Sequence, residues 1–257
     1  EIMALMEVSV DLRMKSVVEI ANFLSGGIDS TSIIKMAAKN HKLNTFSVSI
    51  NESDYDESRW FNSVSNKFDT NHITINLNSQ NLENEIIVES INIFDEPYSD
   101  PSTIPSYILS KEISKNYKVA ISGDGGDELF GGYDRLRIVL QKNNLLKASL
   151  AKLYSVYPAH LGTGNRLLRN SKNINIAYPS FLEDKKLLDL LGVKAEFNFV
   201  ENYLQNSDDF IKNILISDIK LYLSEMMMLK VDRTSMANSL EVRSPFVDHR
   251  LIEYVLS

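Results

Sequence analysis

Two apolar runs that each lead directly into a glycine-rich turn limit the fold of this chain more than any other feature. Val17–Leu24 (VVEIANFL) runs into Ser25–Ser30 (SGGIDS), and Tyr117–Ser122 (YKVAIS) runs into Ser122–Tyr133 (SGDGGDELFGGY). Both runs have the length and the β-branched content of buried strands. In an open parallel sheet, ligands bind beyond the carboxyl ends of the strands. The two turns are therefore expected at one edge of one sheet.

Strand and helix patterns alternate through the first half of the chain. Strands separated by segments of helix length indicate right-handed βαβ crossovers and a parallel sheet. The sequence therefore predicts an α/β fold, a parallel sheet with helices on both faces. Two further strands are expected in this half, at Thr45–Ile50 and His72–Leu77. Four helical stretches are expected, of which the last is interrupted by prolines: Ile2–Lys15, Ser30–Lys39, Asp56–Phe68 and Leu82–Lys115.

The strand signal fades after Tyr133, and the second half of the chain is expected to be a C-terminal helical part. Its helical patterns lie at Lys186–Leu191, Asp208–Leu223 and Arg250–Leu256. We expect one domain over residues 1–257, with a core sheet over about 12–135 and a helical extension over about 136–257.

The SGGIDS turn has the features of an anion-binding loop. Two adjacent glycines, Gly26 and Gly27, allow a tight turn whose backbone can approach a bulky anion. Amide groups at the start of the following helix favour phosphate, and Ser25 and Ser30 add hydroxyl donors. Asp29 would repel phosphate unless a magnesium ion lies between them. The turn is neither a Walker A loop nor a GxGxxG fingerprint; the alternative is a plain strand-to-helix turn capped by Asp29 and Ser30.

The second turn, SGDGGDELFGGY, combines five glycines with three acids, Asp124, Asp127 and Glu128. Because both turns belong at the same sheet edge, Asp29 and Asp127 are expected to share one magnesium ion bound to pyrophosphate. The alternative is a solvated acidic turn, which Asp-Gly dipeptides form readily.

Both turns resemble those of a known superfamily. SGGIDS is similar to the pyrophosphate-binding loop of the N-type ATP pyrophosphatases, which split ATP between the α- and β-phosphates to adenylate a carboxylate or carbonyl oxygen. SGDGGDELFGGY resembles the asparagine synthetase family of the glutamine-hydrolysing type and the related β-lactam synthetases. Three further blocks resemble that family in the same order: Thr45–Ser58, Phe94–Tyr107 and Leu229–Tyr254. The resemblance runs from about Leu12 to Leu256, weaker over about Gln141–Ser217, and implies an adenine nucleotide alpha hydrolase-like fold.

The resemblance also implies a set of site residues. It places the adenosine site at Leu24 and Val48, with further nucleotide contacts at Ser122 and Gly123. The residues implied to hold pyrophosphate are Ser25, Gly26, Gly27, Asp29 and Ser30. The implied magnesium ligands are Asp29 and Asp127. The implied catalytic residues are Asp29, Asp124 and Asp127, and the implied substrate contacts are Asp124, Glu128 and Arg233.

The implied reaction has two steps. ATP adenylates the β-carboxylate of aspartate to give β-aspartyl-AMP and magnesium pyrophosphate, and ammonia then displaces AMP to give asparagine. In the family the ammonia comes from an N-terminal glutaminase domain with a cysteine nucleophile, and a lysine in a K-x-x-L-R-like segment beyond the PFVDH motif stabilises charge. Neither occurs in these 257 residues. We therefore expect a fragment of a longer protein, without the glutaminase domain and the C-terminal end, that binds ATP and magnesium better than it turns over.

Two other functions remain open at this point. A family member that acts on another carboxylate, either a β-lactam-forming synthetase or an amidotransferase for a sugar acid or a peptide, would share the nucleotide loops. A non-catalytic ATP-binding module would share them too.

Charged residues in the Leu229–Tyr254 block have two interpretations. They form an ion-pair network that packs the helical part on the sheet, or they shape the aspartate pocket, and we favour the network. These residues are Asp232, Arg233, Glu241, Arg243 and Asp248. Elsewhere, Trp60 in SRWFNSVSNKF is expected on the buried face of an amphipathic helix.

Charge and composition exclude several other classes of protein. A net charge of -7 and a pI near 5.2 disfavour nucleic acid as a partner, because nucleic-acid binding requires a basic footprint. No run approaches the roughly 18 apolar residues of a membrane span. The absence of cysteine removes disulfides, thiolate metal sites and cysteine nucleophiles. A cytoplasmic location is expected by elimination, and a homodimer is left open.

Overall fold

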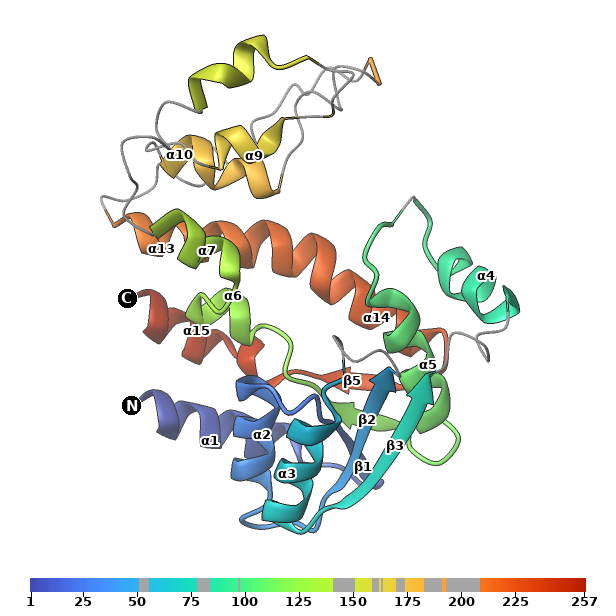
Figure 1. Cartoon of the computed structure of the whole chain (residues 1–257). Helices are drawn as coiled ribbons and strands as arrows, with labels where there is room; N and C mark the ends of the chain where they lie inside the picture. The colour runs from blue at the N-terminus through green and yellow to red at the C-terminus, as the bar shows by residue number, and fades with distance from the viewer. Residues whose placement is uncertain are drawn as a thin grey trace. The chain divides into compact units, whose positions relative to one another are not determined.

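A computed structural model of the chain describes residues 1–50, 56–77, 84–96, 98–140, 151–158, 162, 164–169, 174–182, 191–192 and 209–257 (Figure 1). These residues form two compact units. The first comprises Glu1–Leu129 and Leu223–Ser257, and the second comprises Phe130–Tyr222.

The first unit is built on a five-stranded parallel sheet with the strand order β3-β2-β1-β4-β5. The strands are β1 (Ile20–Phe23), β2 (Asn44–Ile50), β3 (Asn71–Leu77), β4 (Val119–Ile121) and β5 (Glu241–Arg243). The chain proceeds outward from β1 to β2 and β3, and then crosses to the other side of β1 to form β4. The carboxyl ends of β1 and β4 therefore flank the point where the direction of winding reverses, and ligands of open α/β sheets bind at this switch point.

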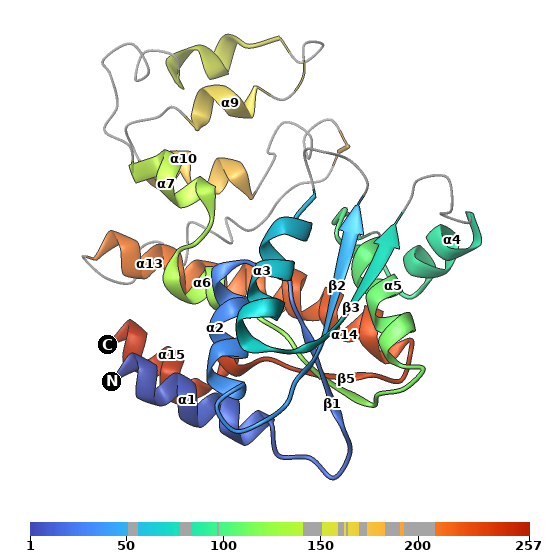
Figure 2. The same cartoon turned by 60° about the horizontal axis from the view of Figure 1, so that its bottom comes forward.

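Helices cover both faces of this sheet (Figure 2). On one face α5 packs against β2, β3 and α14, and its Ile113 joins a core with Ala21, Phe46 and Ala120. On the other face α2 lies between α1 and α3. The helices of this unit are α1 (Ile2–Arg13), α2 (Ile28–Ala37), α3 (Ser58–Phe68), α4 (Asn84–Asn92), α5 (Thr103–Ile113), α6 (Gly126–Phe130, its last residue beyond the unit), α14 (Met228–Met236), the 3-10 turn η5 (Pro245–Val247) and α15 (His249–Leu256).

The regular elements among the described residues of the second unit are helices. The elements are α7 (Asp134–Leu140), η1 (Ala151–Val156), α9 (Asn165–Leu168), α10 (Ile174–Ala177), η3 (Pro179–Phe181) and α13 (Phe210–Ser217), and the π-helical segment η4 (Asp218–Met227) continues from this unit into the first. Its core holds a buried ion pair, because Arg135 Nη2 lies 3.0 Å from Asp218 Oδ1 and Arg135 Nε donates to the Tyr178 hydroxyl at 3.0 Å. Burial and the nearby Asp218 raise the pKa of Tyr178 far above its usual range. In the described part of the chain, no helix combines the length and apolar character of a membrane span.

The four predicted strands and the α/β fold class are confirmed. β1 begins at Ile20, three residues later than predicted, and Val17 and Val18, which precede it, are exposed. The expectation that the chain is helical after Tyr133 is wrong at Glu241–Arg243. These residues form β5 beside β4, so the sheet extends beyond the expected range of 12–135. Of the helix predicted at Lys186–Leu191, residues 186–190 lie outside the described residues.

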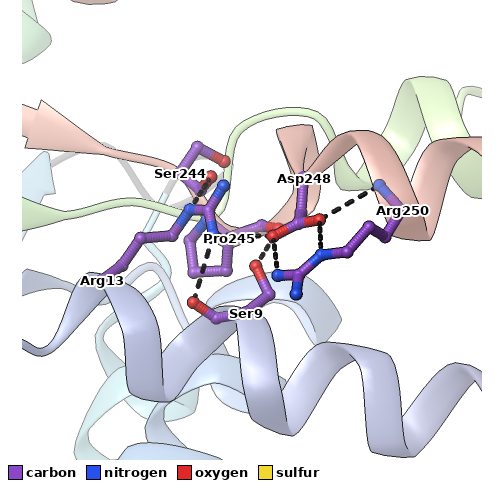
Figure 3. Close-up of polar contacts among 6 residues, drawn as sticks. All are labelled: Ser9, Arg13, Ser244, Pro245, Asp248 and Arg250. Atoms are coloured by element: carbon purple, nitrogen blue, oxygen red, sulfur yellow. Dashed lines mark hydrogen bonds and ion pairs between the residues drawn. The ribbon is translucent and has the colours of Figure 1, made fainter.

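A polar network joins α1 to the C-terminal elements, and α1 and α15 lie side by side (Figure 3). The buried Asp248 carboxylate pairs with Arg250 Nη2 at 2.7 Å and with Arg13 Nη1 at 2.9 Å. Arg13 Nε also donates to the Ser244 carbonyl at 2.9 Å. The bonds from Arg250 and Arg13 hold the pKa of Asp248 well below its usual range. Asp248 therefore takes part in an ion-pair network, but its partners, Arg13 and Arg250, are not among the residues expected to form it, and the network joins α1 to the C-terminal elements. Figure 3 draws its members: Ser9, Arg13, Ser244, Pro245, Asp248 and Arg250.

We predict that Asp248→Ala lowers the free energy of unfolding by about 3 kcal/mol at pH 7, because it leaves the Arg13 guanidinium without its buried partner. The matched surface change Lys39→Ala, which removes an exposed pair with Glu7, should cost less than about 0.5 kcal/mol. Since the folded pKa of Asp248 is depressed, its stabilisation is complete above about pH 4 and declines as the pH falls further. Urea unfolding between pH 7 and pH 3 measures this, and equal losses for the two variants would contradict it.

Candidate active site at the carboxyl edge of the sheet

The first glycine-rich turn leaves the sheet at Leu24, which is buried and donates its amide to the Phe46 carbonyl at 2.9 Å. Gly26 has φ = +84°, a conformation that side chains rarely adopt. A Cβ at Gly26 would lie 2.6 Å from the Phe61 amide nitrogen, so the turn rests directly on the first turn of α3. Helix α2 begins at Ile28, immediately after the glycines. Its free amide groups therefore lie at the switch point.

Hydroxyl groups hold the turn in shape. Ser25 Oγ and Ser30 Oγ are 3.0 Å apart, and the Gly27 amide donates to Ser25 Oγ at 3.2 Å. Ser30 is buried, whereas Ser25 and Gly27 are exposed. The exposed backbone at the start of α2 is the arrangement that favours phosphate.

The second turn lies against the first. A Cβ at Gly123 would lie 3.1 Å from the Ser30 amide nitrogen, and a Cβ at Gly126 would lie 2.6 Å from Asp29 Oδ1. The Asp29 carboxylate thus occupies space that any side chain at Gly126 would fill. The structure brings the two turns together, as the sequence predicted.

The site concentrates negative charge. Burial, followed by repulsion from Asp127 and Asp124, raises the pKa of Asp29 to about 6. Within the described ranges, no three His, Cys, Asp or Glu side chains are arranged as a metal site. Two carboxylates completed by phosphate oxygens and water are nevertheless the usual environment of protein-bound Mg2+. The donor set of Asp29 and Asp127 therefore fits a magnesium ion carried in with a phosphate ligand.

Ser122, which follows β4, is 2% exposed, and its buried hydroxyl has no hydrogen-bond partner among the described residues. Its amide donates to the Arg243 carbonyl of β5 at 3.0 Å. A buried polar group without a partner is uncommon and is expected to meet a ligand or water. Beside it, Gly123 leads into the second turn, and Val48 lies half-buried on β2.

Two of the predicted substrate contacts, Glu128 and Arg233, are either buried or already paired. Glu128 is 1% exposed, so its carboxylate is enclosed within the fold. Arg233 lies on α14, and among the described residues its ion-pair partner is Asp95. Asp124 and Asp127 remain partly exposed beside Asp29.

Residues far along the chain support the second turn, and no local pattern in the sequence predicts this contact. The Ser244 hydroxyl donates to the Asp124 carbonyl. Gly125 has φ = +93°, and a Cβ there would lie 3.1 Å from Val247 Cγ1. The block Leu229–Tyr254, which contains SPFVDH, resembles the family, but its contact with the turn depends on tertiary packing.

The burial of Trp60, near the site, differs from the prediction. Trp60 is 57% exposed, whereas its neighbour Phe61 is 0% exposed, so the assignment of Trp60 to the core is wrong. The helical phase of α3 points Phe61 inward and leaves Trp60 outside.

A lysine on α14 makes a further contact within this unit. Lys230 Nζ lies 3.1 Å from Asp100 Oδ2 and 2.7 Å from Ser102 Oγ, and these bonds connect the segment before α5 to α14.

Comparison with known proteins gives a consistent result. The family model described as Asparagine synthase matches residues 1–257. The chain is 32% identical over 256 residues to "Asparagine synthetase [glutamine-hydrolyzing] 1" of Bacillus subtilis, covering 93% of this chain and 40% of that protein. It is 29% identical over 264 residues to a "Putative asparagine synthetase [glutamine-hydrolyzing]" of Mycobacterium tuberculosis, covering 96% of this chain and 40% of that protein. The chain thus spans about two fifths of the length of these curated relatives.

We predict that Asp29 makes the fold less stable as the pH rises from about 4 to 6 in metal-free buffer. Its folded pKa, about 6, is above its unfolded value, so the folded state holds an extra proton in this window and loses that advantage on ionisation. Asp29→Asn should remove this part of the pH dependence. Urea unfolding of both proteins at pH 4 and pH 7 tests the difference, and parallel profiles would contradict it.

We predict that Gly126→Ala destabilises the fold by about 1–3 kcal/mol, because the new methyl group overlaps the Asp29 carboxylate. In an Asp29→Ala background the same substitution should cost markedly less, since the overlapping atoms are gone. A double-mutant cycle of unfolding free energies measures the coupling. An identical cost in both backgrounds would show that the two turns do not meet.

Proposed function

This chain belongs to the asparagine synthase family, and on that premise we propose that it is the ATP-dependent, amide-forming part of a longer ligase of the glutamine-hydrolysing asparagine synthetase type. In the proposed reaction, ATP adenylates the β-carboxylate of aspartate with release of pyrophosphate, and ammonia then displaces AMP to give asparagine. The observation that carries the proposal is the contact between the two glycine-rich turns, in which the Asp29 carboxylate meets the backbone at Gly126.

The nucleotide is proposed to lie across the switch point. Its pyrophosphate portion meets the amide groups at the start of α2 and the hydroxyls of Ser25 and Ser30, where Gly26 and Gly27 leave room for it. The adenosine portion lies over Leu24 and Val48. Ser122 and Gly123 contact the nucleotide between these portions, and the unpartnered Ser122 hydroxyl supports this assignment.

Magnesium is proposed to bind to Asp29 and Asp127 together with the phosphates. The raised pKa of Asp29 supports a cation here, because a positive ion would relieve the repulsion from Asp127 and Asp124. When bound, magnesium neutralises phosphate charge as pyrophosphate departs. The chain's own contribution is alignment and charge stabilisation, since adenylation requires the carboxylate and the α-phosphorus to meet in line.

The aspartate substrate is proposed to approach from the second turn. Asp124 is the best placed of the three proposed contacts, because it is partly exposed beside Asp29. A role for Glu128 would require its enclosed carboxylate to act through a neighbouring group. A role for Arg233 would require exchange of its partner Asp95.

Ammonia is proposed to come from a glutaminase domain outside these 257 residues. The relatives are named as glutamine-hydrolysing, and they are longer than this chain, which covers 40% of each of the two compared. We place the reaction in the cytoplasm.

We predict that the chain binds ATP only with magnesium and that its ATP–pyrophosphate exchange is fastest with aspartate among carboxylate substrates. Asp29→Asn and Asp127→Asn should each lower exchange by about a hundredfold, because each removes a ligand that neutralises the developing charge. The control Asp69→Asn changes an acid that is 93% exposed and should leave exchange unaltered. Calorimetry and isotope exchange measure these effects. Faster exchange with another carboxylate would reassign the substrate, and the absence of nucleotide binding would overturn the proposal.

A further inference from the structure

The proposed nucleotide site lacks a basic side chain in both of its glycine-rich turns. Neither Ser25–Ser30 nor Ser122–Tyr133 contains a lysine or an arginine, and Asp124 and Asp127 lie near enough to Asp29 to repel its carboxylate. A bound triphosphate adds further negative charge. One magnesium ion offsets only part of it, and sites that transfer phosphoryl groups usually add a lysine or an arginine.

The first turn of α3 lies next to the phosphate loop. Helix α3 follows β2, so it begins at the same carboxyl edge of the sheet as α2 (Figure 1). A Cβ at Gly26 would lie 2.6 Å from the Trp60 Cβ and 2.7 Å from the Trp60 carbonyl carbon. The fully buried Phe61 fixes this turn of helix against the sheet. Trp60 therefore has a set position beside the loop, and Arg59 precedes it in the same turn of α3.

Arg59 presents a cation from the same turn of helix as Trp60. Its side chain is exposed, and its guanidinium carbon lies 5.3 Å from the centroid of the Trp60 ring. Over the described ranges, Arg59 forms no ion pair with a carboxylate, and the neighbouring Asp56 is engaged by the amide and hydroxyl of Ser58 at 2.9 Å each. An aromatic face limits the motion of a guanidinium without neutralising its charge. The charge thus remains available to an anion.

We propose that Arg59, held against Trp60, binds the β- and γ-phosphates of ATP and the pyrophosphate that leaves. This inference rests on the proposed function. In the adenylation step a carboxylate oxygen forms a bond to the α-phosphorus, and the bond from the α-phosphorus to the bridging oxygen breaks. The electron pair of that bond stays on the departing pyrophosphate, where Arg59 stabilises the added charge. The guanidinium suits this role because it donates two parallel hydrogen bonds to phosphate oxygens.

The test compares Arg59→Gln with Lys67→Gln in the intact chain. Lys67 is a matched control, because it is in the last turn of the same helix and its Nζ lies 5.8 Å from the Phe68 ring centroid. Inorganic pyrophosphate with magnesium is the probe, measured by calorimetry and by the fluorescence of Trp60, the single tryptophan of the chain. Arg59→Gln should weaken pyrophosphate binding by about tenfold to a hundredfold, the range for a charged hydrogen bond. Lys67→Gln should change it by less than about twofold.

AMP binding is a second control, because AMP lacks the β- and γ-phosphates. It distinguishes the loss of a contact with those phosphates from a general disturbance of the nucleotide site. Arg59→Gln should leave AMP affinity and the melting temperature nearly unchanged, and Arg59→Lys should restore part of the pyrophosphate affinity. Equal weakening of AMP and pyrophosphate, or no effect on pyrophosphate, overturns the role of Arg59 while the proposed function stands. If the unaltered chain binds neither magnesium–ATP nor magnesium–pyrophosphate, the proposed function fails and this inference fails with it.

Discussion

The close approach of the Asp29 carboxylate to the backbone of Gly126 is the contact on which the rest of the site depends. It is sterically allowed only because position 126 has no side chain. It places a half-buried carboxylate near two more acids, and burial and repulsion together raise the pKa of Asp29 to about 6. The three carboxylates repel one another, and the cation proposed to bind there would relieve this repulsion. A cradle of this kind favours a metal-chelated polyphosphate over a free anion.

The second turn depends on segments that are distant in the sequence. The Ser122 amide donates to a carbonyl of β5, and the Ser244 hydroxyl donates to the Asp124 carbonyl. The Val247 side chain lies against Gly125. The same C-terminal block is joined to α1 through Arg13 and the buried Asp248, as Figure 3 shows. The position of the turn is therefore set by both ends of the described first unit. A substitution in α1 can disturb the site through this network without touching a ligand.

Several interpretations drawn from the residues hold because they depend on local chemistry. Gly26 adopts a positive φ and has no room for a Cβ, as a tight strand-to-helix turn requires. Phe61 and Trp60 show the limit of such reasoning. Both are aromatic and adjacent, and only the packing of α3 on the sheet decides that Phe61 is enclosed and Trp60 is left outside. For Glu128, the sequence shows that an acid lies in the second turn, but it does not show that the side chain is buried.

The sequence by itself determined the first four strands, the two glycine-rich turns and their placement at one sheet edge, because periodicity and turn chemistry are properties of short segments. Tertiary structure alone decided that Glu241–Arg243 form a fifth strand, since three residues carry no periodic signal and pair only because β4 presents an open edge. It also decided that Trp60 lies beside Gly26, which is 34 positions earlier in the chain. Contacts between such distant residues arise from the packing of whole elements, and no local pattern encodes them.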